Sequence, residues 1–291
     1  MRKRIAVLLL LALLLTGCGE KKTDEQPEDL PGKTEEQTPD RPGALSFVAE
    51  TTAFEGTKKA EDGTPLVTYA FQIPTLTVYQ ADGTQLVDAK NEKEQAALAA
   101  QEVFNAKFEE WTQTADIEGM TAAAKEHLDM MKEFGTEWVG GYVMELGCGI
   151  YQTERMVSVS GIYYSYTGGA HPNTYHMGWN FDVETGTFLD VKLLGEDDGL
   201  QEAVAAEILR QAKLPQDGGW VPAETYWENH ESIIADWSSY AVCFHEKGMT
   251  VTFSAYELAP YAAGPQEFHF SYDWLEPHLN SQGKLLLGLE A

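Results

Sequence analysis

Basic residues are scarce in this chain of 291 residues. Its 46 Asp and Glu residues outnumber 20 Lys and Arg residues, which gives a formal net charge of −26. A surface this acidic repels the phosphates of nucleic acids and the head groups of anionic lipids. We therefore expect no nucleic-acid partner and no electrostatic docking on anionic polymers. The charge favours a cationic partner, or it serves solubility alone.

Cysteine is also rare, with three residues in the whole sequence: Cys18, Cys148 and Cys243. Cys18 lies near the N-terminus, which leaves an even number in the rest of the chain. An extracytoplasmic location would permit a disulfide between Cys148 and Cys243. Both lie in sequence typical of strands, where free buried thiols are equally ordinary. The sequence leaves the two alternatives open.

The N-terminus has the features of a targeting segment. Arg2, Lys3 and Arg4 precede an apolar run from residue 5 to residue 15, which is too short to span a bilayer comfortably but suits a signal sequence. The run ends in Leu-Thr-Gly-Cys, which resembles the lipobox of bacterial lipoproteins. We therefore predict lipidation at Cys18 and attachment to the outer face of the cell membrane.

Residues 19–43 are predicted to be a disordered acidic tether, because they carry four prolines, many charges and a single large aliphatic side chain. Residues 44–291 are long enough for one large domain or two small ones. Segments of strand-like alternation and of helical periodicity follow one another in the order β, α, β-β-β, α-α, β-β-β. This order predicts an α+β fold with mainly antiparallel sheet, in two lobes at 44–135 and 136–291.

Two amphipathic helices are predicted between residues 92 and 134. In the first, apolar residues recur at spacings of three and four. In the second, from Met120 to Phe134, the same spacing predicts Leu128, Met131 and Phe134 on the buried side, with Gly135 as a cap.

The most distinctive stretch runs from Gly161 to Asp190 and reads as two strands joined by a Gly-Gly-Ala-His-Pro loop. Gly168 and Gly169 can adopt positive φ, and Pro172 favours an extended conformation at His171. We expect a rigid hairpin that presents His171 at its tip.

Signatures of catalysis and of metal binding are missing from the sequence. No glycine-rich loop opens a helix, and Ser165 and Ser254 lack the Gly-x-Ser-x-Gly context of a nucleophile elbow. His171 and His176, with Asp182 or Glu184 as a third ligand, match no metal motif that we recognise. We therefore predict no cofactor, no metal ion and no catalytic residue.

Two motifs occur in the order in which one known family has them. The first runs from Tyr166 to Asn173 and is followed by Asn180-Phe181-Asp182 and Thr185-Gly186. The second runs from Tyr256 to Gly264. Together they resemble the extracytoplasmic pair of domains of unknown function in RsiV-type anti-sigma factors and PdaC-type peptidoglycan deacetylases. The resemblance covers about residues 136–280, and a weaker one covers about residues 45–135. RsiV-type proteins use this region to bind lysozyme, whereas PdaC-type proteins carry it ahead of a catalytic domain.

The resemblance implies a non-enzymatic binding module at the cell surface, since neither an anti-sigma segment nor a deacetylase domain is evident in the sequence. The expected ligand is a lysozyme-like protein of the envelope or a peptidoglycan glycan. The alternative is an enzyme on cell-wall glycan that uses His171 and nearby carboxylates, and the loops could also be purely architectural. The residues predicted to bind the ligand are Tyr166, Gly168, Gly169, His171, Asn173 and Tyr261.

Overall fold

The computed structural model describes residues 44–138, 140–213 and 225–289. The predicted signal sequence, the lipidation site at Cys18 and the tether at 19–43 lie outside the described residues. None of the helices that the model describes has the length and apolar character needed to cross a membrane.

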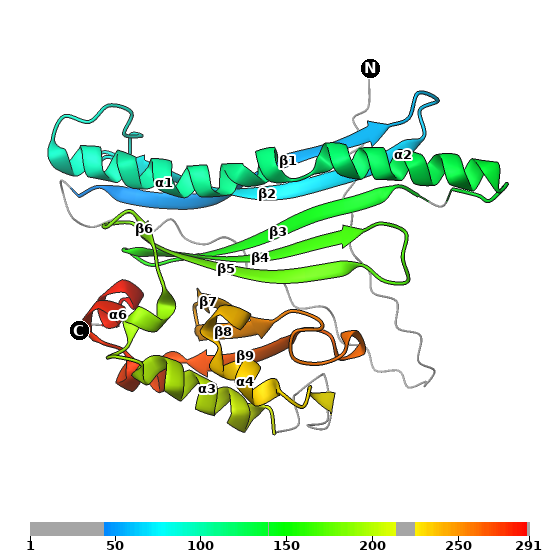
Figure 1. The fold of residues 1–291 in the computed structure, drawn as a ribbon. Helices are drawn as coiled ribbons and strands as arrows, with labels where there is room; N and C mark the ends of the chain where they lie inside the picture. Colours follow the sequence, from blue (N-terminus) through cyan, green and yellow to red (C-terminus); the bar gives the residue numbers. More distant parts are fainter. Residues whose placement is uncertain (1–43, 139, 214–224, 290–291) are drawn as a thin grey trace, which may run out of the picture. The chain divides into compact units, whose positions relative to one another are not determined.

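A six-stranded sheet, here called the large sheet, takes up the first half of the described chain (Figure 1). Its strands follow in chain order: β1 (Ser46–Lys59), β2 (Pro65–Tyr79), β3 (Tyr142–Gln152), β4 (Met156–Tyr166), β5 (Asn173–Asp182) and β6 (Thr187–Phe188). All neighbouring strands are antiparallel except β2 and β3. The parallel pair arises because two helices, α1 (Glu92–Thr114) and α2 (Ile117–Glu133), carry the chain back along the sheet.

A three-stranded antiparallel sheet, the small sheet, contains β7 (Ala241–His245), β8 (Gly248–Phe253) and β9 (Gln266–Ser271). Short helices surround it: η1 (Val191–Leu194), α3 (Gly199–Gln211), α4 (His230–Ala235), η3 (Trp237–Ser239), η4 (Tyr261–Ala263), α5 (Tyr272–Leu275), η5 (Glu276–His278) and α6 (Ser281–Leu287). The predicted α+β class with mainly antiparallel sheet is confirmed. The pairing of β2 with β3 joins the two predicted lobes in one sheet, so the boundary at 135/136 does not separate two sheets.

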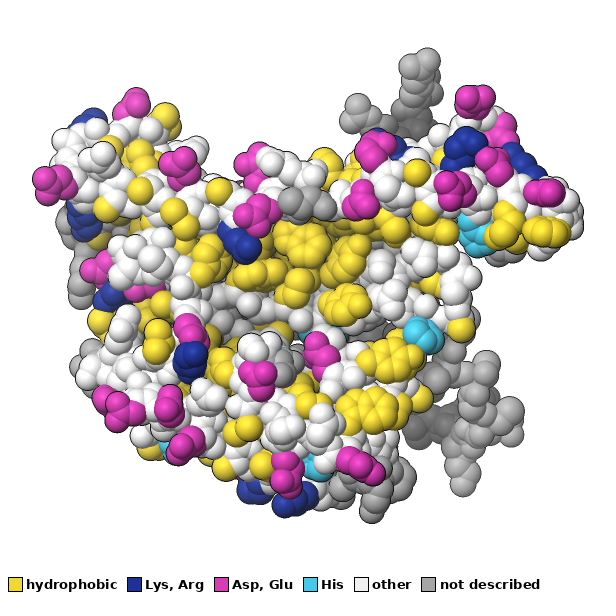
Figure 2. All heavy atoms as spheres, viewed as in Figure 1, with side chains coloured by type: hydrophobic (Ala, Val, Ile, Leu, Met, Phe, Trp, Pro, Cys, Tyr) yellow, Lys and Arg dark blue, Asp and Glu magenta, His cyan; other side chains and the backbone are white. Residues whose placement is uncertain are grey.

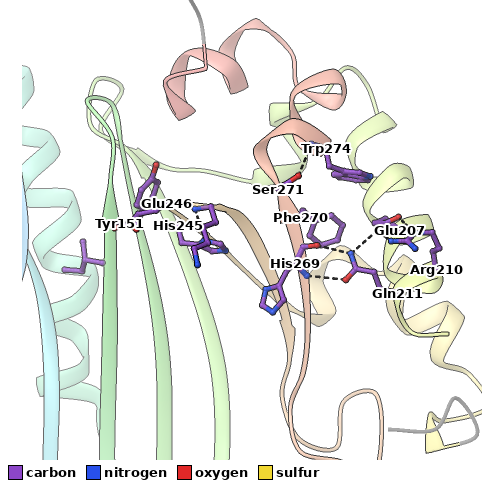
Figure 3. A pocket seen from close by; sticks show the side chains of 12 residues that line it. Tyr151, Glu207, Arg210, Gln211, His245, Glu246, His269, Phe270, Ser271 and Trp274 are labelled. Atoms are coloured by element: carbon purple, nitrogen blue, oxygen red, sulfur yellow. Dashed lines mark hydrogen bonds and ion pairs between the residues drawn. The ribbon is translucent and has the colours of Figure 1, made fainter. Parts of the chain in front are cut away.

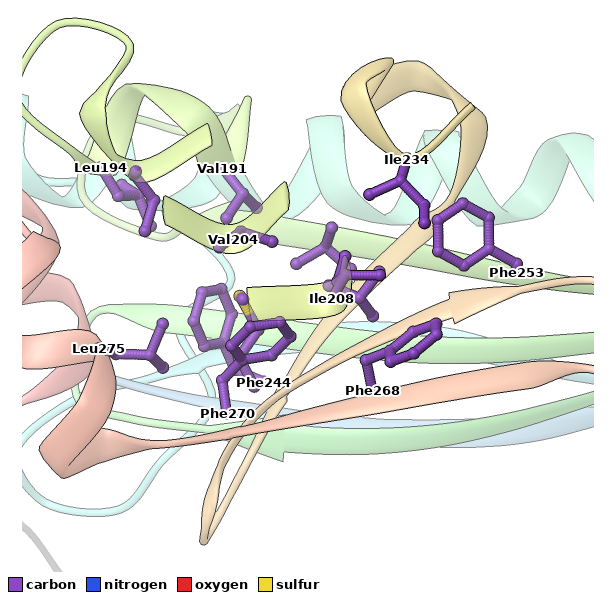
Figure 4. Packing of buried hydrophobic residues seen from close by; sticks show 14 of the residues in the cluster. Val191, Leu194, Val204, Ile208, Ile234, Phe244, Phe253, Phe268, Phe270 and Leu275 are labelled. Atoms are coloured by element: carbon purple, nitrogen blue, oxygen red, sulfur yellow. The ribbon is translucent and has the colours of Figure 1, made fainter. Parts of the chain in front are cut away.

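Two main hydrophobic cores lie on the two sides of the large sheet. The first fills the space between this sheet and α1 and α2, with Phe71, Phe104 and Phe108 fully buried. The second lies between the small sheet and α3, where Val204 and Ile208 meet the side chains of all three small-sheet strands (Figure 4). Burial of this much aromatic and aliphatic surface supplies the main stabilisation of the fold.

The end of α2 differs from the expectation. Leu128 is buried as predicted and Met131 is partly buried, but Phe134 is 75% exposed. The helix ends at Glu133, and Gly135 takes a positive φ of 64° in the turn that follows. Phe134 therefore lies past the end of the helix, where helical periodicity no longer fixes the direction of its side chain.

Polar groups join the two sheets at a close approach of their backbones. The backbone N–H of Phe244 in β7 donates to Ser158 Oγ at 2.8 Å, and Asn180 Nδ2 donates to the carbonyl oxygen of Val242 at 2.9 Å. Ser158 Oγ also donates to Asn180 Oδ1 at 2.7 Å. Side chains of β4 and β5 thus satisfy the backbone groups on one edge of β7, which would be costly to bury unpaired.

Candidate functional site

The predicted hairpin is confirmed, with β4 and β5 paired from Met156–Asp182 to Ser165–Asn173. Gly168 has a φ of 86°, the left-handed conformation that the loop requires. The hydroxyl of Tyr166 donates to the carbonyl oxygen of Gly169 at 3.1 Å. Tyr166 and the two glycines therefore shape the loop from within.

Both nitrogens of the His171 ring have neutral neighbours. Nδ1 lies 3.0 Å from the carbonyl oxygen of Pro172, which can only accept, so Nδ1 carries a hydrogen. In the neutral imidazole, Nε2 then accepts from the hydroxyl of Tyr256, at 3.1 Å. These bonds hold the ring in one orientation and occupy the atom that a general base would use.

Tyr261 stacks on the same ring. The ring centroids of His171 and Tyr261 are 3.8 Å apart with an interplanar angle of 17°, and Tyr256 lies 5.5 Å from Tyr261. We call His171, Tyr256 and Tyr261 the aromatic loop cluster. It joins the β4–β5 loop to the loop between β8 and β9, so the two sequence motifs meet in space. Tyr256 is 54% exposed, and the other two rings are half-buried.

The base of the cluster is held by hydrogen bonds. Tyr256 takes a φ of 74°, a conformation that a tyrosine adopts only under constraint. Its carbonyl oxygen accepts from Trp227 Nε1 at 3.0 Å. Next to it, Ser254 is buried, receives the backbone N–H of His176 at 2.9 Å, and donates its own N–H to the carboxylate of Glu257. The cluster is thus preorganised by its own loop and by β5.

Burial changes two pKa values close to this base. The pKa of Glu257 is raised, because burial penalises its charged form more than the hydrogen bonds from Ser254 favour it. The pKa of His176 is lowered, again mainly by burial, with Glu267 opposing the shift. Both shifts act in the same sense, toward the uncharged form of each side chain relative to water.

The remaining predicted residues lie apart from the aromatic loop cluster. Asn173 is exposed at the start of β5, where it pairs with Ser165. Asp182 is fully buried at the other end of β5, 3.9 Å from the guanidinium of Arg155, and accepts the backbone N–H groups of the following turn. Glu184 binds the same guanidinium at 2.6 Å. The carboxylates of Asp182 and Glu184 therefore bind Arg155 and the backbone of the turn after β5. Within the described residues, no group of three or more potential metal ligands is brought together.

Cys148 and Cys243, the two cysteines among the described residues, are both free, so the disulfide considered from the sequence is not formed. Cys148 belongs to the core under α1 and α2. Cys243 lies on the other side of the large sheet, with Sγ 3.7 Å from the carbonyl oxygens of Val159 and Met177. The sheet separates the two thiols. Burial raises the pKa of each to about 12, so neither is a reactive thiolate at neutral pH.

A pocket of about 890 Å³ lies next to the small sheet, away from the predicted loop (Figure 3). His245 Nε2 and His269 Nδ1 each lie 3.0 Å from the hydroxyl oxygen of Thr250, which bridges them. Arg210 faces the pocket in a bidentate ion pair with Glu207. The charges of Arg210 and Glu207 cancel, as do those of Lys247 and Glu246, which also line the pocket, so the pocket offers little net charge to a ligand.

The second motif, Tyr256 to Gly264, falls inside a region that matches a known family. Residues 196–273 match DUF3298, a domain described as a protein of unknown function. The β4–β5 loop lies outside the matched region. No curated protein matches the chain.

Solved structures similar to the chain include two DUF3298 family proteins. One is a member of the DUF3298 family from Bacteroides fragilis NCTC 9343, at 16% identity and a TM-score of 0.56, with 86% of this chain and 98% of that chain covered. The other is a DUF3298 family protein from Pseudomonas aeruginosa PAO1, at 18% identity and a TM-score of 0.43, with coverage of 81% and 96%. The first supports the fold of nearly the whole chain and assigns no activity to it.

Tyr256 was not among the residues predicted to bind the ligand, although the second motif, Tyr256 to Gly264, begins with it. The sequence signal for a role of Tyr256 is weak, because it consists only of a Tyr-Glu pair between a strand and an Ala-Pro-Tyr turn. The positive φ that aims the Tyr256 side chain at His171 is held by tertiary contacts: Trp227 bonds the carbonyl oxygen of Tyr256, and Ser254 in the same loop accepts the N–H of His176 in β5.

Proposed function

We propose that this protein is a lipid-anchored extracytoplasmic binding protein that holds a cationic, lysozyme-like protein of the cell envelope at its aromatic loop cluster. The observation that carries the proposal is the meeting of the two motif loops, where His171 stacks on Tyr261 and bonds to the exposed Tyr256. Tyrosines held rigidly at a surface supply large contact area at low entropic cost and are enriched in binding hot spots.

The charge of the chain supports a cationic partner. A net charge of −26 would steer a basic protein toward the surface and would suppress anionic competitors. The enzyme alternative receives less support, because both nitrogens of His171 are bonded to neutral groups.

Titration of residues 44–291 with lysozyme tests the proposal. We expect binding that weakens as salt rises, since steering between exposed charges is screened. Tyr261→Ala should weaken binding about tenfold by removing the stack on His171. Tyr175→Ala is the control, because it also removes a tyrosine ring from the surface and Tyr175 lies outside the cluster. Absence of binding at both low and moderate salt would remove this partner, and binding of wall glycan to the cluster instead would favour the other predicted ligand class.

The proposed anchor has its own test. When the chain is expressed in a bacterium with a labelled fatty acid, label should enter the wild type and not Cys18→Ser. Equal labelling of both, or of neither, would contradict lipidation at Cys18.

A further inference from the structure

A second groove, on the opposite side of the large sheet from the small sheet, carries aromatic side chains that the proposed function does not use. It has a volume of about 490 Å³ and lies where α1 gives way to α2 above β3, β4 and β5. Figure 2 shows hydrophobic side chains gathered in a hollow beneath the helices. The groove is lined by Trp111, Tyr163, Trp179, Met120, Met144, Ala115, Lys107, Glu110 and Asp116.

Trp179 lies on the floor of this groove in a fixed orientation. A Cβ atom at Gly161 would come within 2.6 Å of the six-membered ring of Trp179, so the ring lies against the bare backbone of β4. Phe108 meets the indole edge-on, with centroids 5.2 Å apart and an interplanar angle of 79°. The glycine and the phenylalanine therefore hold one indole face as a platform, and the ring remains partly exposed.

Trp111 and Tyr163 extend the aromatic lining. Their ring centroids are 5.5 Å apart, and both side chains are only partly buried. Trp111 projects from the last turns of α1, whereas Tyr163 belongs to β4, so helix and sheet each contribute one wall. The rings come from rigid elements, and their geometry is set before any ligand arrives.

The rim of the groove is polar and carries charges of both signs. Lys107 Nζ lies 3.1 Å from the carboxylate of Glu110, and both side chains are about half exposed. Asp116, at the start of α2, is exposed and accepts the N–H of Gly119 at 2.9 Å. The groove thus combines aromatic faces with an ammonium group and carboxylates that line it.

This combination matches the chemistry of a sugar chain. The negative face of an aromatic ring attracts the slightly positive C–H groups on the flat side of a pyranose. Hydroxyl groups, which point outward around the same ring, need donors and acceptors such as those of the rim. A purely apolar peptide would match the aromatic floor of the groove but would use none of its polar rim.

We propose that this groove binds an oligosaccharide of glucose-type pyranosides, whose flat faces stack on Trp179 and Trp111 and whose hydroxyl groups bond to Lys107, Glu110 and Asp116. The site is independent of the aromatic loop cluster, which lies on the other side of the large sheet.

The test is calorimetric titration of the full-length protein in detergent with cellotetraose and with the tetramer of N-acetylglucosamine. We expect at least one of them to bind, and Trp179→Ala to weaken that binding about tenfold. Trp274→Ala, in the pocket beside the small sheet, is the matched control and should bind as the wild type does.

Lys107→Ala covers the case in which Trp179→Ala fails to fold, because Lys107 is partly exposed and its ion pair contributes little to stability. It should weaken binding severalfold, whereas Lys125→Ala, which removes a similar helical ion pair on α2, should not. Tyr261→Ala should leave sugar binding unchanged, which separates this site from the aromatic loop cluster. Failure of both tetramers to bind at millimolar concentration would overturn the proposal. So would equal binding by the wild type, Lys107→Ala and a folded Trp179→Ala.

Discussion

At the scale of single residues, the contact between the two sheets depends on small side chains. β7 crosses the large sheet above Gly178, where an added Cβ would lie 2.3 Å from the carbonyl oxygen of Val242. Ser158 and Asn180 flank this point and bond the edge of β7. The glycine therefore permits the close approach, and the two polar residues stabilise it.

Gly178→Ala should destabilise the protein by about 1–3 kcal/mol, because backbone would have to move to relieve the clash. Gly147→Ala is the matched control: it is also a strand glycine of the large sheet, and nothing lies within 4 Å of its added Cβ. Urea denaturation of both variants measures the difference. Equal stability of the two would show that the sheets do not pack as closely as described.

His245 makes stability depend on pH. Its pKa is lowered by burial first, then by His269 and by Lys247, so the folded protein resists protonation of this ring. The stabilisation is complete above the unfolded-state pKa of about 6.5 and is lost as the pH falls through the lower folded-state pKa.

We therefore expect the urea midpoint of the wild type to fall between about pH 7.5 and pH 5.5, and to fall less in His245→Gln. His278→Gln serves as the control, since that histidine lies outside the His245–Thr250–His269 chain. If the urea midpoint fell equally in the wild type and in His245→Gln, the pH dependence would not come from His245.

At the scale of elements, α1 completes a sheet edge that strands leave open. β3 pairs with β2 only from Val67 to Phe71. Beyond that point, Asn105 in α1 accepts the N–H of Leu76 at 2.6 Å and donates to its carbonyl oxygen at 3.1 Å, and Gln101 accepts the N–H of Val78 at 2.9 Å. Helical side chains thus replace a missing strand.

Asn105→Ala should cost about 1–3 kcal/mol, since it leaves both backbone groups of Leu76 without their partner. Glu102→Ala, an exposed substitution on the same helix, should change stability by less than about 0.5 kcal/mol. Thermal or chemical denaturation compares the two. A cost for Asn105→Ala no larger than that for Glu102→Ala would mean that water replaces these bonds freely.

Elements that depend on local pattern were predictable, and contacts between them were not. Alternation found β1, β2, β4 and β5, and helical spacing found α1 and α2, because these periods follow from backbone geometry. The parallel pairing of β2 with β3 and the crossing at Gly178 depend on long-range packing that no local period records. For the same reason the sequence predicted His171 at a loop tip but not its bond to Tyr256.

At the scale of the whole molecule, the two main cores share the strands of the large sheet. Met156 and Val157 are neighbours in β4, yet Met156 packs into the core around α3 and Val157 into the core under α1 and α2. Loss of either core would expose one face of the same strands. The two cores should therefore unfold together.

We expect one calorimetric transition for residues 44–291, with far-ultraviolet circular dichroism and tryptophan fluorescence giving the same midpoint. Leu128→Ala in one core should cost about 2–5 kcal/mol, Val204→Ala in the other should also be destabilising, and each should lower that single midpoint. Val103→Ala is the control, because Val103 is exposed on α1. Two resolved transitions, each shifted by only one of the core substitutions, would show that the large sheet does not couple the cores.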